Sequence, residues 1–219
     1  EGLIDEPIRH SITKMSHLHF VAIDVYRNRV IQLGEQPGSV FLVGGLGIDN
    51  IVKLKLLGRK ELEQSLDFKL GSKNLMITFH PVTLENGTSE EQMQELLAAL
   101  GELKDTHLIF TLPNADTDGR IIKKMIDKFV STRGEISISF ISMGSLKYLS
   151  TLQFVDGVVG NSSSGLLEAP TFKIATVNIG DRQKGRLKAQ SIIDCDPTKD
   201  SIKKAIETLY SNEFQQTLP

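Results

Sequence analysis

Apolar residues along this chain gather in two kinds of segment, short and long. Most of the short ones are continuous apolar runs without the apolar–polar alternation of a half-exposed strand. Such runs are typical of parallel strands that are buried on both faces. The predicted strands are His19–Ile23, Val40–Val43, Leu75–Phe79, Leu108–Leu112, Ile136–Ile141, Gly157–Gly160 and Ile174–Ile179.

The long segments carry apolar residues at helical spacing. In 117–132 the apolar side chains share one face, and the lysines lie on the opposite face. The same pattern predicts helices over 89–103 and 199–211, and Ile8–Ser16 forms another after Pro7. Because predicted strands and helices alternate, the sequence indicates an α/β fold with a doubly wound parallel sheet.

The glycine-rich run Val43–Gly47 breaks this alternation and marks a domain boundary. Residues 1–44 hold too few strands for a domain of their own, so they are expected to be the closing elements of an upstream Rossmann-like half. Residues 45–219 then form a second, complete Rossmann-like half. The chain opens at Glu1 rather than at Met, which favours a truncated chain.

Composition excludes several classes of partner and site. The 219 residues carry a net charge of −2, so no basic surface indicates nucleic acid or an anionic membrane. No apolar stretch approaches the roughly 20 residues that span a bilayer. A single cysteine, Cys195, excludes an internal disulfide framework and suits a reducing cytoplasm.

Polar residues that follow the predicted strands are the candidates for chemistry, because open α/β sheets bind ligands at the carboxyl ends of their strands. The run Asn161–Pro170 (NSSSGLLEAP) follows one strand and leads into a short helix. Helix capping would explain one serine, whereas several serines with a glycine favour an anion site at the helix N-terminus. Glu168 would be repelled by a diphosphate, so vicinal hydroxyls such as those of a ribose are its better partner.

Four other positions have both a structural and a functional interpretation. His80 ends a buried strand before Pro81 and could donate to a phosphate oxygen, with a purely structural role equally weighted. Arg182 lies with Arg186 in a glycine-bounded loop that could clamp a diphosphate. Asn114 is slightly better explained as a turn residue, and Asp5 before Pro7 as a helix start.

Three histidines near the amino terminus do not complete a metal site. His10 and His17 could share a helix face with His19 close by, but no acidic or cysteine ligand stands at a recognisable spacing. No metal is therefore predicted.

Four blocks of sequence together resemble a known family, and their order and spacing agree across nearly the whole chain. The blocks are IDEPIRHSITK at 4–14, FHPVT at 79–83, NSSSGLLEAP at 161–170 and NIGDRQKGR at 178–186. This combination is similar to the hydrolysing UDP-N-acetylglucosamine 2-epimerases, which supply N-acetylmannosamine for sialic acid synthesis.

The resemblance implies a GT-B arrangement of two Rossmann-like domains with the active site between them. It implies anti-elimination of UDP to a glycal intermediate, followed by hydration with inversion at C2, and requires no metal or nicotinamide cofactor. By motif match, Ser162, Ser163 and Glu168 would hold UDP, with Glu168 on the ribose. His80 and Arg182 would lie at the diphosphate, where His80 stabilises the leaving group, and Asn114 would lie near the nucleotide. Asp5 matches one of the family's acid/base carboxylates.

The resemblance also limits what this chain is expected to do. The family's other catalytic carboxylates lie upstream of residue 1, and the chain also stops before the family's last helix. We therefore expect a fragment that binds UDP weakly and does not turn over, from an enzyme that forms a homodimer. Alternatives are the sister activity on UDP-2,4-diacetamido sugars for legionaminic acid, a GT-B glycosyltransferase, and a non-catalytic nucleotide-sugar-binding module.

Overall fold

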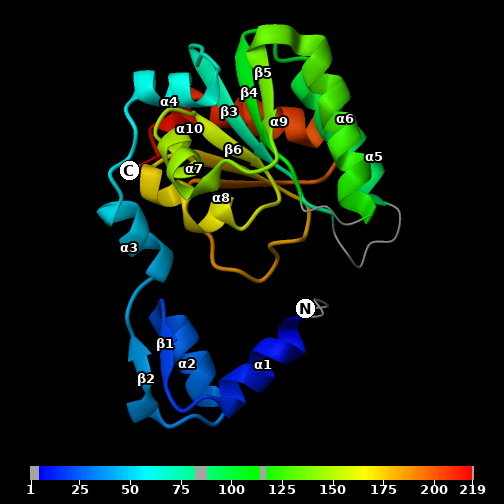
Figure 1. Cartoon of the computed structure of the whole chain (residues 1–219). Helices are drawn as coiled ribbons and strands as arrows, with labels where there is room; N and C mark the ends of the chain where they lie inside the picture. Colours follow the sequence, from blue (N-terminus) through cyan, green and yellow to red (C-terminus); the bar gives the residue numbers. More distant parts are fainter. Residues whose placement is uncertain (1–4, 82–87, 114–116, 219) are drawn as a thin grey trace. The chain divides into compact units, whose positions relative to one another are not determined.

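The computed structural model describes residues 5–81, 88–113 and 117–218, without the side chains of Asp5, Thr117 and Asp118. The chain forms two compact units, Glu1–Leu54 and Lys55–Pro219, and each is described by itself (Figure 1). This division falls after the helix α3 (Leu46–Lys53) rather than at residues 44–45. The division into units reflects which residues pack against one another. The domain assignment 1–44 and 45–219 rests instead on the number of strands in each part, and it stays a prediction.

The first unit is built on a small parallel pair of strands. β1 (His19–Val21) pairs with β2 (Val40–Leu42), and both are shorter than predicted. Helices α1 (Asp5–Met15) and α2 (Asp24–Gln32) accompany them. Because neighbouring strand residues point to opposite faces, His19 and Val40 are buried while Phe20 and Phe41 lie exposed on the other face. The two phenylalanine rings stack at 5.5 Å.

The second unit is a six-stranded sheet in which every pairing is parallel. The strand order is β5–β4–β3–β6–β7–β8. The bounds are β3 (Lys73–Thr78), β4 (Thr106–Thr111), β5 (Ser137–Phe140), β6 (Gly157–Gly160), β7 (Ala175–Ile179) and β8 (Ile192–Cys195). The doubly wound α/β fold predicted from the run pattern is confirmed, and β8 is an additional strand that the pattern did not reveal.

Helices cover both faces of this sheet, as Figure 1 shows with α7 and α8 in front of the strands and α9 behind them. α5 packs against both α6 and α9, and α4 packs against α7. The bounds are α4 (Arg59–Leu66), α5 (Thr88–Gly101), α6 (Thr117–Arg133), α7 (Gly144–Leu152), α8 (Ser164–Leu167), α9 (Lys199–Leu209) and α10 (Asn212–Gln215). The helices over 89–103, 117–132 and 199–211 are thus confirmed within two residues at each end.

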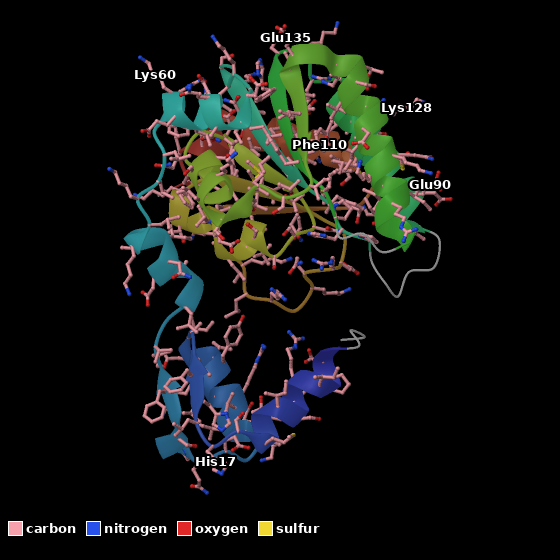
Figure 2. All side chains as sticks on the ribbon, in the orientation of Figure 1. His17, Lys60, Glu90, Phe110, Lys128 and Glu135 are labelled. Carbon is pink, nitrogen blue, oxygen red and sulfur yellow. The ribbon has the colours of Figure 1, made fainter. Side chains whose placement is uncertain are left out.

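The core of the second unit lies between β3, β4, β6 and β7 and the helices α5, α6 and α9. Phe110 on β4 is fully buried there, whereas Lys60, Glu90 and Lys128 project from the helices at the periphery (Figure 2). Burying such apolar side chains stabilises the unit by about 1.5–3 kcal/mol for each one. The sheet is therefore a rigid base for the loops at its edges.

The strand order creates a ligand-binding position. From β3 the chain moves outward to β4 and β5, then returns past β3 to β6 and continues outward to β7 and β8. The connections leave the adjacent strands β3 and β6 in opposite directions, and open α/β sheets bind ligands outside the carboxyl ends of strands at such a point. In the described part of the chain, no helix has the length and apolar character needed to cross a membrane.

Candidate functional site

Three loops meet at the carboxyl ends of the central strands. The first follows β3 and contains His80, the second follows β6 and begins at Asn161, and the third follows β7 and contains Arg182. All three lie at the carboxyl ends of β3 and β6 or beside them. Hydrogen bonds between residues far apart in the sequence hold them together.

A glycine allows the first two loops to approach each other. Gly160, the last residue of β6, has φ +142°, and a Cβ atom built on it would lie 2.0 Å from the carbonyl oxygen of Thr78. No side chain fits in that space. The next residue, Asn161, donates its backbone N–H to the same Thr78 oxygen at 3.1 Å. The β6 loop is therefore packed directly onto the end of β3.

Asn161 is the centre of the hydrogen bonding between the loops. Its side chain is buried, with Oδ1 accepting the His80 backbone N–H at 2.8 Å and Nδ2 donating to the His80 carbonyl oxygen at 2.8 Å. Its own carbonyl oxygen accepts from Arg182 at 3.1 Å and from Gln183 Nε2 at 2.8 Å. The structure thus brings together His80 and Arg182, two residues selected from sequence, through Asn161, to which the sequence analysis gave no separate role.

The serine run differs from the helix start that its sequence suggests. α8 is a single turn, and Ser163 at its N-cap position makes no side-chain capping bond. Instead Ser162 Oγ accepts the N–H of Ser164 at 3.3 Å. A helix of four residues has little macrodipole, so the anion site at the N-terminus of α8 stays a prediction that would depend mainly on local N–H and hydroxyl donors. The side chains of Ser162 and Ser163 are nevertheless partly exposed.

Close packing positions this turn against the sheet. A Cβ atom on Gly165 would lie 2.5 Å from Cγ2 of Thr176 on β7, so only glycine fits there. Thr176 Oγ1 also donates to the Gly165 carbonyl oxygen at 2.8 Å. The turn and the residue that follows it, Glu168, are therefore held at a defined distance from β7.

Glu168 carries an unsatisfied acceptor. Its Oε2 atom is buried and has no hydrogen-bond partner among the residues that the structure describes. Leaving a buried polar atom unpaired costs about 1–3 kcal/mol, more for a charged group, so the fold retains this atom at a loss of stability. A buried polar atom without a partner requires an explanation, and a ligand that donates a hydrogen bond to it would be one.

Tyr148 on α7 lies beside this carboxylate. Its hydroxyl is hydrogen-bonded to Ser164 Oγ. Burial is the main cause that raises the Tyr148 pKa to about 12, the Ser164 bond lowers it, and the negative charge of Glu168 raises it further. The phenol therefore stays protonated at neutral pH, and its hydrogen bond to Ser164 supports the serine turn.

Replacing Tyr148 is expected to change the alkaline stability of the second unit. The folded pKa of about 12 lies above the ordinary tyrosine pKa of about 10, so the contribution is fully present below pH 10 and is lost as the pH rises through 12. Tyr148→Phe should lower the free energy of unfolding by about 1 kcal/mol at pH 8 and flatten its decline above pH 10. Urea unfolding at a series of pH values measures this. Tyr26→Phe in the first unit is the control, and an unchanged alkaline slope in Tyr148→Phe would contradict the assignment.

The lysine side chains of the third loop form ion pairs with carboxylates close to them. Lys184 pairs with Asp181, and Lys188 contacts both carboxylate oxygens of Asp194 on β8 at 2.7 and 2.8 Å. Arg186 is exposed. A hollow of about 410 Å³ lies beside this loop at the ends of β7 and β8.

A larger hollow, about 920 Å³, lies at the opposite edge of the sheet, where β4 and β5 begin. It is lined by side chains of both charges, among them Lys60, Glu63, His107 and Glu135. This mixture gives no preference for an anion. The candidate site is therefore at the carboxyl edge, despite the smaller volume there.

Two predicted site residues are not placed at this edge. Asn114 lies outside the described residues. Asp5 begins α1 in the first unit, and its side chain is also outside the described part. Within that part, no group of three His, Cys, Asp or Glu side chains could hold a metal ion. His10 contacts Glu6 at 3.1 Å and His19 contacts Glu35 at 3.2 Å.

Comparison with known proteins gives the same family across the chain. A family model described as UDP-N-acetylglucosamine 2-epimerase matches residues 1–218. The chain is 43% identical over 215 residues to the GDP/UDP-N,N'-diacetylbacillosamine 2-epimerase (hydrolyzing) of Campylobacter jejuni, covering 98% of this chain and 56% of the relative. It is 44% identical over 215 residues to the polysialic acid biosynthesis protein P7 of Escherichia coli, covering 96% and 53%. The chain thus spans about half the length of these curated relatives.

The fold also has solved counterparts. The structure of UDP-GlcNAc 2-epimerase from Neisseria meningitidis bound to UDP-GlcNAc matches with a TM-score of 0.72 at 16% identity, covering 99% of this chain and 59% of that one. At this identity the likeness bears on the fold alone, and it agrees with a Rossmann-like half of a GT-B arrangement.

Proposed function

This chain belongs to the UDP-N-acetylglucosamine 2-epimerase family, and we propose from that premise that it carries the UDP-holding part of a hydrolysing UDP-sugar 2-epimerase. The proposed enzyme converts UDP-N-acetylglucosamine into UDP and N-acetylmannosamine. The observation that carries the proposal is the joining of three loops at the carboxyl ends of β3, β6 and β7, with Glu168 Oε2, which has no partner among the described residues, next to the serine turn.

Each proposed contact with UDP uses a group of suitable chemistry. Ser162 and Ser163 are partly exposed hydroxyls that can donate to phosphate oxygens. Arg182 and His80, joined through Asn161, can supply N–H donors to the diphosphate. Glu168 can accept both hydroxyls of a ribose, and this would satisfy its buried oxygen.

The proposed reaction needs these groups because the nucleotide is the leaving group. A base removes the proton from C2 of the sugar, the bond between C1 and the phosphate oxygen breaks, and its electron pair leaves with UDP. A double bond then joins C1 and C2. Water adds its oxygen to C1, and a proton returns to C2 on the opposite face. Donors such as His80 and Arg182 would stabilise the charge that builds on the departing diphosphate, the kind of electrostatic contribution that is usually largest in enzymes.

The remaining roles are also proposals. Asp5 would be one of the acid/base carboxylates, and Asn114 would lie near the nucleotide. The enzyme would act in the cytoplasm as a homodimer without metal or nicotinamide, in keeping with its single cysteine.

A second sugar is favoured by one specific comparison. The 43% identical Campylobacter jejuni relative is named for N,N'-diacetylbacillosamine, a diacetamido sugar. We therefore include a UDP-2,4-diacetamido sugar as the second candidate substrate. Both candidates share UDP, so the contacts described above do not distinguish them.

Calorimetric titration with UDP, UMP and ATP tests the nucleotide part of the proposal directly on this chain. UDP should bind more tightly than UMP because the second phosphate adds contacts, and ATP should not bind because its base differs. Equal affinities for UDP and UMP would show that the second phosphate makes no contact with the proposed site. Absence of UDP binding would overturn the proposal.

Product analysis tests the chemistry and the choice of sugar. The chain would be joined to the amino-terminal part of its Campylobacter jejuni relative and incubated with each UDP-sugar in turn. Proton NMR should show UDP together with the free 2-epimeric sugar. Release of UDP without that sugar would contradict the epimerase assignment.

A further inference from the structure

Asn161 joins two loops in a way that only an amide side chain can. Its Oδ1 accepts the His80 N–H and its Nδ2 donates to the His80 carbonyl oxygen, both at 2.8 Å. A carboxylate would lose the donor, and an apolar side chain would lose both bonds. The backbone at His80 is therefore set by the orientation of Asn161.

Gln183 in turn holds Asn161. It stands in a loop whose neighbouring residues Asp181, Lys184 and Gly185 are exposed, yet its own side chain is 2% exposed. Its Nε2 donates to the Asn161 carbonyl oxygen at 2.8 Å. Because that acceptor is a carbonyl, the amide has one possible orientation, with nitrogen toward Asn161.

Glutamine is not the residue that would stabilise the fold most at this buried position. In the described part of the chain, Gln183 Oε1 is buried without a hydrogen-bond partner. Burying an unpaired amide oxygen is unfavourable, and a methionine of similar length would fill the space without that loss. A role in fixing Asn161 accounts for a glutamine at this position, whereas simple packing does not.

We propose that Gln183 is a positioning residue of the nucleotide site, which sets the His80 backbone through Asn161 and so aligns the loops after β3, β6 and β7. This inference rests on the proposed function for its consequence in UDP binding. Its structural part, the control of the His80 backbone, does not depend on any ligand.

Gln183→Glu provides a test that pH can reverse. At pH 8 the carboxylate faces the Asn161 carbonyl oxygen and cannot donate, so UDP affinity should fall about tenfold, the equivalent of one lost hydrogen bond. Burial beside an oxygen raises the pKa of such a carboxyl, whereas the Arg182 guanidinium, which donates to the same Asn161 oxygen, lowers it. As the pH falls to 5 and below, the protonated carboxyl donates to Asn161, so affinity should return to within about threefold of the unmodified chain at the same pH.

Two further variants separate positioning from packing. Gln183→Met keeps the volume without the bond and should show the loss at both pH values. Gln190→Glu introduces the same charge at an exposed residue of the same loop and should behave as the unmodified chain. A loss in Gln183→Glu that does not reverse as the pH is lowered to 5 and below would overturn the positioning role, as would wild-type affinity of Gln183→Glu at pH 8.

Amide hydrogen exchange of His80 in the ligand-free chain keeps the inference distinct from the proposed function. Protection of the His80 N–H should fall in Gln183→Glu at pH 8, while protection of the β4 amides should not change. If UDP fails to bind the unmodified chain but His80 protection falls, the proposed function is wrong and the positioning role stands. Unchanged His80 protection would overturn the positioning role.

Discussion

Gly160→Ala should lower the free energy of unfolding of the second unit more than any other glycine-to-alanine substitution at the carboxyl ends of its strands. The new Cβ atom would lie 2.0 Å from the Thr78 carbonyl oxygen, which belongs to the backbone of β3 and cannot move without breaking the β3–β6 pairing. The φ of +142° adds backbone strain. Together these effects should cost about 3–5 kcal/mol, or roughly 6–20 °C in Tm.

Gly134→Ala is the matched control. Gly134 also has a positive φ, +61°, but a Cβ atom there meets no atom of the described residues within 4 Å. Its replacement should cost only the backbone strain of about 1–2 kcal/mol. Urea unfolding followed by circular dichroism compares the two. If Gly160→Ala costs no more than Gly134→Ala, the close approach of β6 to β3 is not as tight as the structure indicates.

The run pattern predicted the strands in the middle of the sheet and also the edge strand β5. β3, β4 and β6 are largely buried on both faces, and such strands are mostly apolar. β8 escaped prediction because it lies at the edge, where Asp194 is exposed and only Ile192 and Ile193 form an apolar run. α2 escaped because none of its residues is buried, so its sequence carries no apolar stripe.

The candidate site was predictable in position but not in its connections. A polar residue after a buried parallel strand must lie at the carboxyl edge, which places His80 and Arg182 correctly. The same rule places Asn161 there, but its role in joining the loops could not be assigned, since its side chain bonds a backbone 81 residues away. The residues adjacent in sequence do not indicate such a distant hydrogen-bond partner. Gln183 is similar, because an isolated glutamine in a charged loop is normally exposed.

Glu168 links the stability of the fold to the proposed binding of UDP. An unpaired buried carboxylate oxygen destabilises the ligand-free chain, and a ribose hydroxyl that satisfied it would recover that free energy on binding. Glu168→Gln retains the size of the side chain and removes the charge. Its Tm should equal or exceed that of the unmodified chain, which is unusual for a substitution at a partly buried position.

Glu168→Ala should weaken UDP binding roughly 10- to 100-fold, because the loss of a charged acceptor for two hydroxyls corresponds to about 1.5–3 kcal/mol. The sign of the effect is decisive. If Glu168 stood near the diphosphate without touching the ribose, removing its negative charge would strengthen UDP binding. Glu135→Ala removes the same charge from an exposed residue at the opposite edge of the sheet and should leave the affinity unchanged. Calorimetry of the three proteins at one ionic strength measures these affinities. An unchanged or increased affinity in a folded Glu168→Ala variant would exclude the ribose contact, and a loss confined to Glu168→Ala would place the ribose at its buried oxygen.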